Sequence, residues 1–203
     1  MNERDVFINC PFSNDYTQFF HALVYTVVRS GFTPRCAPES DDAGEVRYEK
    51  ICNIIRDCRL GIHDLSMTEL DHVTGLPRFN MPFELGLFLG SSKFGGARVR
   101  RKALNLDRGR FRYRDFLSDI AGQDIRSHDG VPAQAIECVA TWLRDESNDP
   151  NVPGGRAIAA EYERFAAALP RIAASKQLEM DEITFRDFWV AAAEWIAAEY
   201  PPA

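Results

Sequence analysis

Apolar residues recur along the first 146 positions in two alternating spacings. Short runs such as DVFINC (5–10) have the length of buried strands, whereas the stretches between them repeat apolar residues every three or four positions, as amphipathic helices do. The pattern predicts strands at Asp5–Cys10, Phe32–Ala37, Leu60–Leu65, Lys102–Leu106 and Asp124–Ser127. It predicts helices at Asp15–Ser30, Val46–Cys58, from Pro82 onward, Phe111–Ala121 and Pro132–Glu146. This alternation indicates an α/β domain, a five-stranded parallel sheet with helices on both faces.

The chain beyond position 146 has no strand signal. The segment SNDPNVPGG (147–155) indicates a linker, and residues 156–203 predict an α-helical appendage rich in alanine. In its last helix Thr184 and Asp187 have the spacing of a capping box, followed by aromatic residues on one face. We expect this appendage to pack on the α/β domain (1–146) or to join copies of the chain into a homo-oligomer.

Composition narrows the class of protein. A net charge of −6 argues against a general nucleic-acid binder. No apolar run reaches the roughly 18 to 20 residues that span a bilayer, and the start carries no signal sequence, so we predict a cytoplasmic protein without membrane contact. The five cysteines lie scattered in apolar segments, which predicts reduced thiols, and their spacing fits no zinc site. No metal or cofactor is predicted.

The stretch MPFELGLFLGSSKFG (81–95) carries a candidate catalyst, Glu84. Pro82 suits a first helical position, and the apolar residues that recur at helical spacing are Met81, Leu85, Phe88 and Leu89. Glu84 falls at the edge of this apolar face, in the predicted first turn. A glutamate there has a structural explanation, because the helix dipole favours it by roughly 0.3 to 1 kcal/mol. A catalytic role depends on what else converges on this position.

The topology predicts which residues meet Glu84. In such a sheet, ligands bind beyond the carboxyl ends of the strands, where the direction of winding reverses. The residues placed there are Asn9, Cys10, Pro11 and Phe12 after the first strand, His63, Asp64 and Ser66 after the third, and Asp71, Arg78 and Asn80 before the helix. We predict a substrate pocket of these residues. Arg35 and Arg47, near the loop after the second strand, are separate candidates for phosphate contact. Structural alternatives are a loop-capping Asp64 and a core His63.

Three stretches, in this order, resemble two related families. DVFINCPFSNDY (5–16) and DDAGEVRYEKICNIIRDCRLGIHDLS (41–66) resemble a TIR domain, and MPFELGLFLGSSK (81–93) resembles a nucleoside 2-deoxyribosyltransferase. The resemblance covers roughly residues 4–146 and implies a flavodoxin-like fold that cleaves N-glycosidic bonds. It implies that Glu84 is the catalytic carboxylate and, from the deoxyribosyltransferases, that Asp57 assists, although topology favours Asp64. The aromatic residue that many TIR enzymes place before the glutamate is matched only by Phe79 or Phe83.

The resemblance implies three alternative functions. The first is an N-glycosidase that hydrolyses or transfers the glycosidic bond of NAD or a related nucleotide, in a bacterial antiviral effector with an activating partner. The second is a deoxyribosyltransferase-like enzyme for nucleosides or nucleoside monophosphates, and the third is a non-catalytic TIR-like interaction module. Nicotinamide is already cationic within NAD and needs no proton to leave, whereas a purine needs a general acid. The candidate acids are Asp57, Asp64 and His63.

A basic run, Arg98–Arg114, surrounds the fourth predicted strand. It contains eight basic residues in seventeen, interleaved with Phe111 and Tyr113. Such a run can bind the phosphates of a nucleic acid or of a dinucleotide. Its position around a predicted buried strand favours the alternative of a solvated edge paired with acidic residues.

Overall fold

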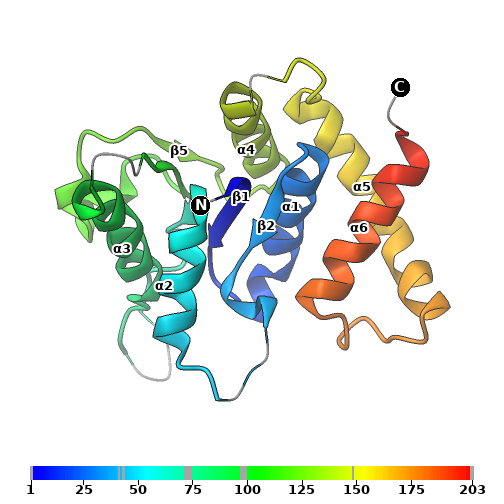
Figure 1. Cartoon of the computed structure of the whole chain (residues 1–203), viewed down its shortest axis with the longest axis horizontal. Coiled ribbons are helices and arrows are strands. Elements are labelled where there is room, and N and C mark those ends of the chain that lie inside the picture. The colour runs from blue at the N-terminus through cyan, green and yellow to red at the C-terminus, as the bar shows by residue number, and fades with distance from the viewer. Residues whose placement is uncertain are drawn as a thin grey trace.

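The computed structural model describes residues 2–40, 42, 44–70, 75–96, 100–147 and 149–201 (Figure 1). Its centre is a five-stranded sheet in the order β2-β1-β3-β4-β5, with every neighbouring pair parallel. The strands are β1 (Asn2–Asn9), β2 (Thr33–Arg35), β3 (Cys58–Asp64), β4 (Lys102–Asp107) and β5 (Ile125–Ser127). This order confirms the predicted flavodoxin-like α/β architecture, in which the winding reverses between β1 and β3.

Helices cover both faces of the sheet (Figure 1). One face carries α1 (Thr17–Arg29) and α4 (Pro132–Ser147), and the other carries α2 (Arg47–Asp57) and α3 (Asn80–Phe94). Beyond α1 and α4 lies an outer layer formed by α5 (Gly155–Ser175) and α6 (Phe185–Glu199). No described helix is long and apolar enough to cross a membrane.

The segments between these elements form short 3₁₀ turns. They are η1 (Asn14–Tyr16), η2 (Ala37–Glu39), η3 (Arg112–Asp115) and η4 (Ser118–Ile120). The helix predicted at Phe111–Ala121 is therefore wrong. Phe111 adopts a left-handed conformation (φ 65°), and Leu117 (φ −145°, ψ 57°) interrupts the chain between η3 and η4, so helical hydrogen bonds cannot propagate.

Alternation along the two central strands separates the two halves of the core. Ile8 pairs with Ile62, and both belong to the large cluster under α1 and α4, whereas Phe7 packs with Phe88 under α2 and α3. Because successive side chains point to opposite faces, the residue after His63 must face the α1 side. His63 and Asp64 are neighbours in sequence, but their side chains lie on opposite faces of the sheet.

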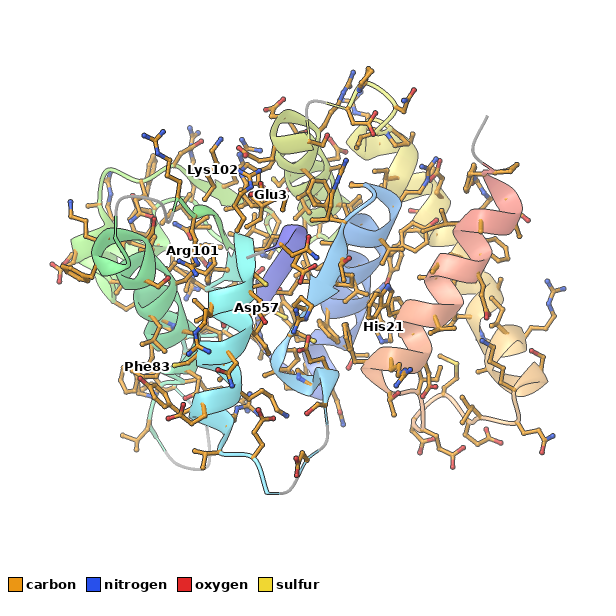
Figure 2. The ribbon with its side chains drawn as sticks, in the orientation of Figure 1. Glu3, His21, Asp57, Phe83, Arg101 and Lys102 are labelled. Atoms are coloured by element: carbon orange, nitrogen blue, oxygen red, sulfur yellow. The ribbon has the colours of Figure 1, made fainter. Side chains whose placement is uncertain are left out.

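The outer layer belongs to the same core as α1. Glu161 of α5 accepts a hydrogen bond from Arg29 at 2.7 Å, and the ring of His21 stacks on Phe188 of α6 at 3.8 Å between centroids. Figure 2 labels His21 between α1 and α6. Burial lowers the pKa of His21 to about 4, so this ring is neutral at physiological pH. The apolar faces of the appendage are thus used within the chain, and assembly through them stays a prediction.

Candidate active site

Glu84 lies one turn inside α3. This helix begins at Asn80, two residues before the predicted start at Pro82, so Glu84 is its fifth residue. Pro82 is tolerated because the first N–H groups of a helix have no intrahelical acceptor. The helix dipole acts mainly within the first turn, so it explains little of why a glutamate occupies this position.

The Glu84 side chain borders a cavity of about 520 Å³ beyond the carboxyl ends of the central strands. The residues that line it are Cys10, Pro11, Phe12, Ser13, Arg47, Arg78, Asn80, Met81 and Glu84. Figure 2 labels Phe83 at the lower end of α3, whereas Glu3 and Lys102, at the starts of β1 and β4, lie at the upper edge. The volume falls in the range of roughly 300 to 1,000 Å³ that is typical of small-molecule sites.

The carboxyl group of Glu84 is shielded from water. Glu84 is only 5% exposed, and burial raises the pKa of its carboxyl from 4.5 to about 7, a shift that the nearby Arg47 guanidinium partly opposes. Both the acid and the carboxylate are therefore populated near neutral pH. Such a raised pKa inside a cavity is typical of functional carboxylates.

Asn9 and His63 lie behind the cavity and do not line it. The Asn9 side-chain N–H donates to the carbonyl oxygen of Met81 at 2.9 Å, and its nitrogen is 3.0 Å from Nδ1 of His63. Burial lowers the pKa of His63 to about 3, so its ring is neutral and accepts at Nδ1. Asn9 thus fastens the end of β1 to the first turn of α3, which positions Glu84.

Asp64 is fully buried on the α1 side of the sheet. Its Oδ1 accepts from the backbone N–H of Ser66 at 2.7 Å, and its Oδ2 is 3.0 Å from Nε2 of His128. Burial opposes ionisation, but the hydrogen bonds from His128 and Ser66 prevail and hold the pKa of Asp64 below its ordinary range. The Asp64 carboxylate is therefore a fixed structural anion that does not line the Glu84 cavity.

Ser66, His128 and Asp64 do not form a catalytic triad. The hydroxyl of Ser66 is 2.8 Å from Nε2 of His128, the same nitrogen that faces Asp64. The other ring nitrogen, Nδ1, accepts from the backbone N–H of Gly130 at 3.2 Å, so Nε2 carries the proton. A triad needs one ring nitrogen on the serine and the other on the carboxylate. The set is a buried hydrogen-bond network.

Two further predicted site residues lie away from the cavity. Asp57 is exposed at the end of α2, directly before β3, and therefore sits at the opposite edge of the sheet from Glu84. Arg35 donates to Glu39 at 2.7 Å and to Asp5 at 2.9 Å. These contacts satisfy its guanidinium within the chain. Asp71 lies outside the described residues.

The described part of the basic run, from position 100 onward, makes internal contacts. Arg101 donates to backbone carbonyls at the end of α2, at 3.0 and 3.1 Å. Arg112 lies 2.6 Å from the buried carboxylate of Asp107 and also donates to the carbonyl of Leu65 at 2.6 Å. Arg98 lies outside the described residues. These arginines join neighbouring elements of the sheet, which leaves less of the run free to contact a nucleic acid.

Two larger cavities lie elsewhere, and neither has a buried carboxyl group without an ion pair among its described lining residues. One of about 690 Å³ lies between β2 and α6, where Arg35 is paired with Asp5 and Glu39. The other, of about 560 Å³, lies between α2 and α3 and has no carboxylate among its described lining residues. The Glu84 cavity is therefore the best candidate for chemistry.

The thiol in the Glu84 cavity is not poised to react. Cys10 is 2% exposed, and burial, followed by the charge of Asp64, raises the pKa of its thiol well above the ordinary 9.0. A thiol that stays protonated is a poor nucleophile and a poor acid. Among the described residues, no three His, Cys, Asp or Glu side chains cluster as metal ligands.

Sequence reasoning missed part of this site. Arg47 was expected near the second strand and in fact borders the same cavity as Glu84, together with Ser13 and Met81. Outside the cavity, His128, the buried partner of Asp64, was also missed, although it directly follows β5. The rule that ligands and polar groups gather at the carboxyl ends of strands, applied to the last strand, would have found it.

Comparisons of the chain with family models, with curated proteins and with solved structures found no match. The resemblance to the two families rests on the sequence motifs, and the function has to be argued from the cavity itself.

Proposed function

We propose that this protein is an N-glycosidase that cleaves the bond between ribose C1′ and nicotinamide in NAD or a related nicotinamide nucleotide. The observation that carries the proposal is the buried Glu84 carboxyl, which borders a cavity at the point where the winding of the sheet reverses. The resemblance to TIR domains and deoxyribosyltransferases, which assigns the catalytic carboxylate to the same residue, supports it.

The chemistry needs one fixed anion. When the C1′–N bond breaks, its electron pair moves to the nicotinamide nitrogen and neutralises the positive charge of the ring, while positive charge develops on C1′ and the ring oxygen of the sugar. The Glu84 carboxylate stabilises this charge or adds to C1′ as a nucleophile. Water then attacks C1′, breaking the bond to Glu84 where the carboxylate has added, and loses a proton to the free carboxylate or to solvent. The products are free nicotinamide and the hydrolysed ribose nucleotide.

The lining of the cavity favours nicotinamide over a purine as the leaving group. Glu84 carries the only carboxyl group among the described lining residues, and the thiol of Cys10 is a poor acid. A purine leaves more easily when a second group protonates it, whereas nicotinamide leaves from a cationic ring without a proton. The residues that were candidate acids, Asp57, Asp64 and His63, do not line the cavity.

Release of free base tests the proposal. Wild type and Glu84→Gln are incubated at high protein concentration with NAD, with deoxyadenosine and with deoxyadenosine monophosphate, and the products are separated by chromatography. We expect nicotinamide release by wild type and a loss of at least about 100-fold in Glu84→Gln. Glu163→Gln, an exposed change on α5, is the matched control and keeps full activity.

Other outcomes would identify the alternatives. Adenine release from the deoxynucleosides, lost in Glu84→Gln, would instead indicate a deoxyribosyltransferase-like enzyme. A folded protein that releases no base from any substrate would indicate a non-catalytic interaction module. Hydrolysis of NAD depletes a cellular cofactor, which is the activity that an antiviral effector of this kind would need.

A further inference from the structure

Two arginines line the same cavity as Glu84 and have no ion pair among the described residues. Arg47 opens α2 and Arg78 precedes α3, and both border the same 520 Å³ space. Neither forms an ion pair or a hydrogen bond within the described part of the chain. By contrast, Arg35 and Arg112 are each held by carboxylates. Free guanidinium groups beside a cavity are available to a ligand.

The charge of this cavity is opposite to that of the protein. Its described lining holds two guanidinium groups and a single carboxyl, so it is positive by one charge when Glu84 is ionised and by two when it is protonated. The whole chain carries −6. A concave site of one sign focuses the field and attracts ligands of the other sign. An anionic ligand is therefore favoured at this position over a neutral one.

The N-terminus of α3 adds backbone N–H donors, which also favour an anionic ligand. Phe79, at its N-cap, makes no side-chain capping bond, and the cavity is lined by the first two residues of the helix, Asn80 and Met81. The N-terminus of a helix carries a partial positive charge and favours phosphate groups. Guanidinium groups bind phosphate oxygens in paired, charge-assisted hydrogen bonds.

We propose that Arg47 and Arg78 bind a phosphate group of the substrate, so that the enzyme selects nicotinamide nucleotides and rejects the unphosphorylated nucleoside. This inference rests on the proposed function and adds the substrate class. Glu84 acts at the glycosidic bond, and the two arginines hold the phosphate that the reaction leaves unchanged. They contribute to substrate affinity and not to the bond cleavage itself.

Three substrates that share one glycosidic bond isolate the contribution of phosphate. Nicotinamide riboside, nicotinamide mononucleotide and NAD have the same leaving group. The mononucleotide adds one phosphate to the riboside, and NAD adds a second phosphate and an adenosine. We expect kcat/KM for the mononucleotide and for NAD to exceed that for the riboside by at least about tenfold. For each arginine replaced by glutamine, we expect KM for the phosphorylated substrates to rise by about 10- to 100-fold, the range expected for a lost hydrogen bond to a charged group. We expect kcat to change little.

Matched variants separate this effect from damage to the fold. Arg171→Gln removes an exposed arginine on α5 and is expected to leave every parameter unchanged. Arg47→Lys keeps the charge but not the paired hydrogen bonds, and is expected to restore part of the lost affinity. Calorimetric titration of Glu84→Gln with the mononucleotide and with the riboside measures the same difference as binding without turnover.

Two results have distinct meanings. Equal kcat/KM for riboside and mononucleotide, or an unchanged KM in Arg47→Gln and Arg78→Gln, would overturn the role of the arginines while the N-glycosidase proposal stands. No nicotinamide release from any of the three substrates would reject the N-glycosidase itself.

Discussion

Replacing Glu84 with glutamine is expected to stabilise the fold at alkaline pH and to have a much smaller effect at pH 5. The pKa of Glu84 is raised from 4.5 to about 7, so the folded protein holds this proton over a pH range in which the unfolded chain has released it. Ionising the buried Glu84 carboxyl costs folding free energy. This cost is nearly absent below pH 4.5, grows as pH rises, and is complete above pH 7. Wild type therefore loses stability in this window, and the glutamine variant does not.

The magnitude follows from the same shift. Raising a carboxyl pKa from 4.5 to about 7 costs roughly 3 kcal/mol of folding free energy once the group is ionised. Only about 1 kcal/mol of this penalty is present at pH 5, so the stability difference between Glu84→Gln and wild type should grow by about 2 kcal/mol between pH 5 and pH 8. The difference between the two proteins removes the contribution of every other titrating group.

Urea denaturation at several pH values measures this difference. Wild type, Glu84→Gln and the exposed control Glu163→Gln are unfolded at pH 5, 6, 7 and 8, and the free energies are extrapolated to water. The control is expected to follow wild type at every pH. A Glu84→Gln difference that does not change between pH 5 and pH 8 would refute the reasoning, because it would mean that Glu84 titrates in the fold as it does in the unfolded chain.

The same pKa should appear in the activity. The proposed reaction uses the ionised carboxylate, so kcat/KM for nicotinamide release should rise with pH through about 7 and then level off. An activity midpoint near pH 4.5 would contradict the link between burial and catalysis, even if Glu84→Gln were inactive.

Three further substitutions test the framework of the site, each by urea denaturation. Asn9→Ala leaves the ring of His63 and a backbone carbonyl of α3 without a buried donor, and should cost about 1 to 3 kcal/mol; an unchanged stability would mean that Asn9 does not fasten β1 to α3. Gly61→Ala would place a methyl 2.7 Å from Nε2 of His63 and 2.8 Å from the ring of Phe88, and should cost about 1 to 3 kcal/mol, recovered in part by Phe88→Leu. Arg112→Gln removes the partner of a buried carboxylate and should cost about 3 kcal/mol; a loss below 1 kcal/mol would contradict this.

The parallel sheet and the edge that carries the candidate site could be predicted because both follow from local patterns. Five apolar runs alternate with amphipathic helices, and only parallel pairing with helices on both faces buries them all. The rule for such sheets then brought Cys10, Phe12, Arg78 and Asn80 to the cavity beside Glu84.

The separation of His63 from Asp64 could also have been predicted from the sequence. The rule that ligands bind at the carboxyl ends of the strands does not consider which face of the sheet each side chain points to. Adjacent strand residues point to opposite faces, so one of the two had to face away from α3. The conformation at Phe111 could not be predicted, because the aromatic and apolar residues between 111 and 120 fit a helix and a phenylalanine rarely adopts a positive φ. The place of Arg47 beside Glu84 could not be predicted either, because it depends on how α2 packs on the sheet.

The two faces of the sheet differ in how deeply they are covered. Behind α1 and α4 stands the outer layer of α5 and α6, whereas α2 and α3 are the last layer on their side and enclose much smaller apolar clusters. Local opening costs least where few apolar contacts are broken. Glu84 and Arg47 both lie on helices of the thinner side, so under the proposed function we expect substrate entry and product release to use local opening of α2 and α3. The side covered by α1, α4, α5 and α6 is expected to open less often. The amides of α1 should therefore exchange with solvent far more slowly than those of α2 and α3.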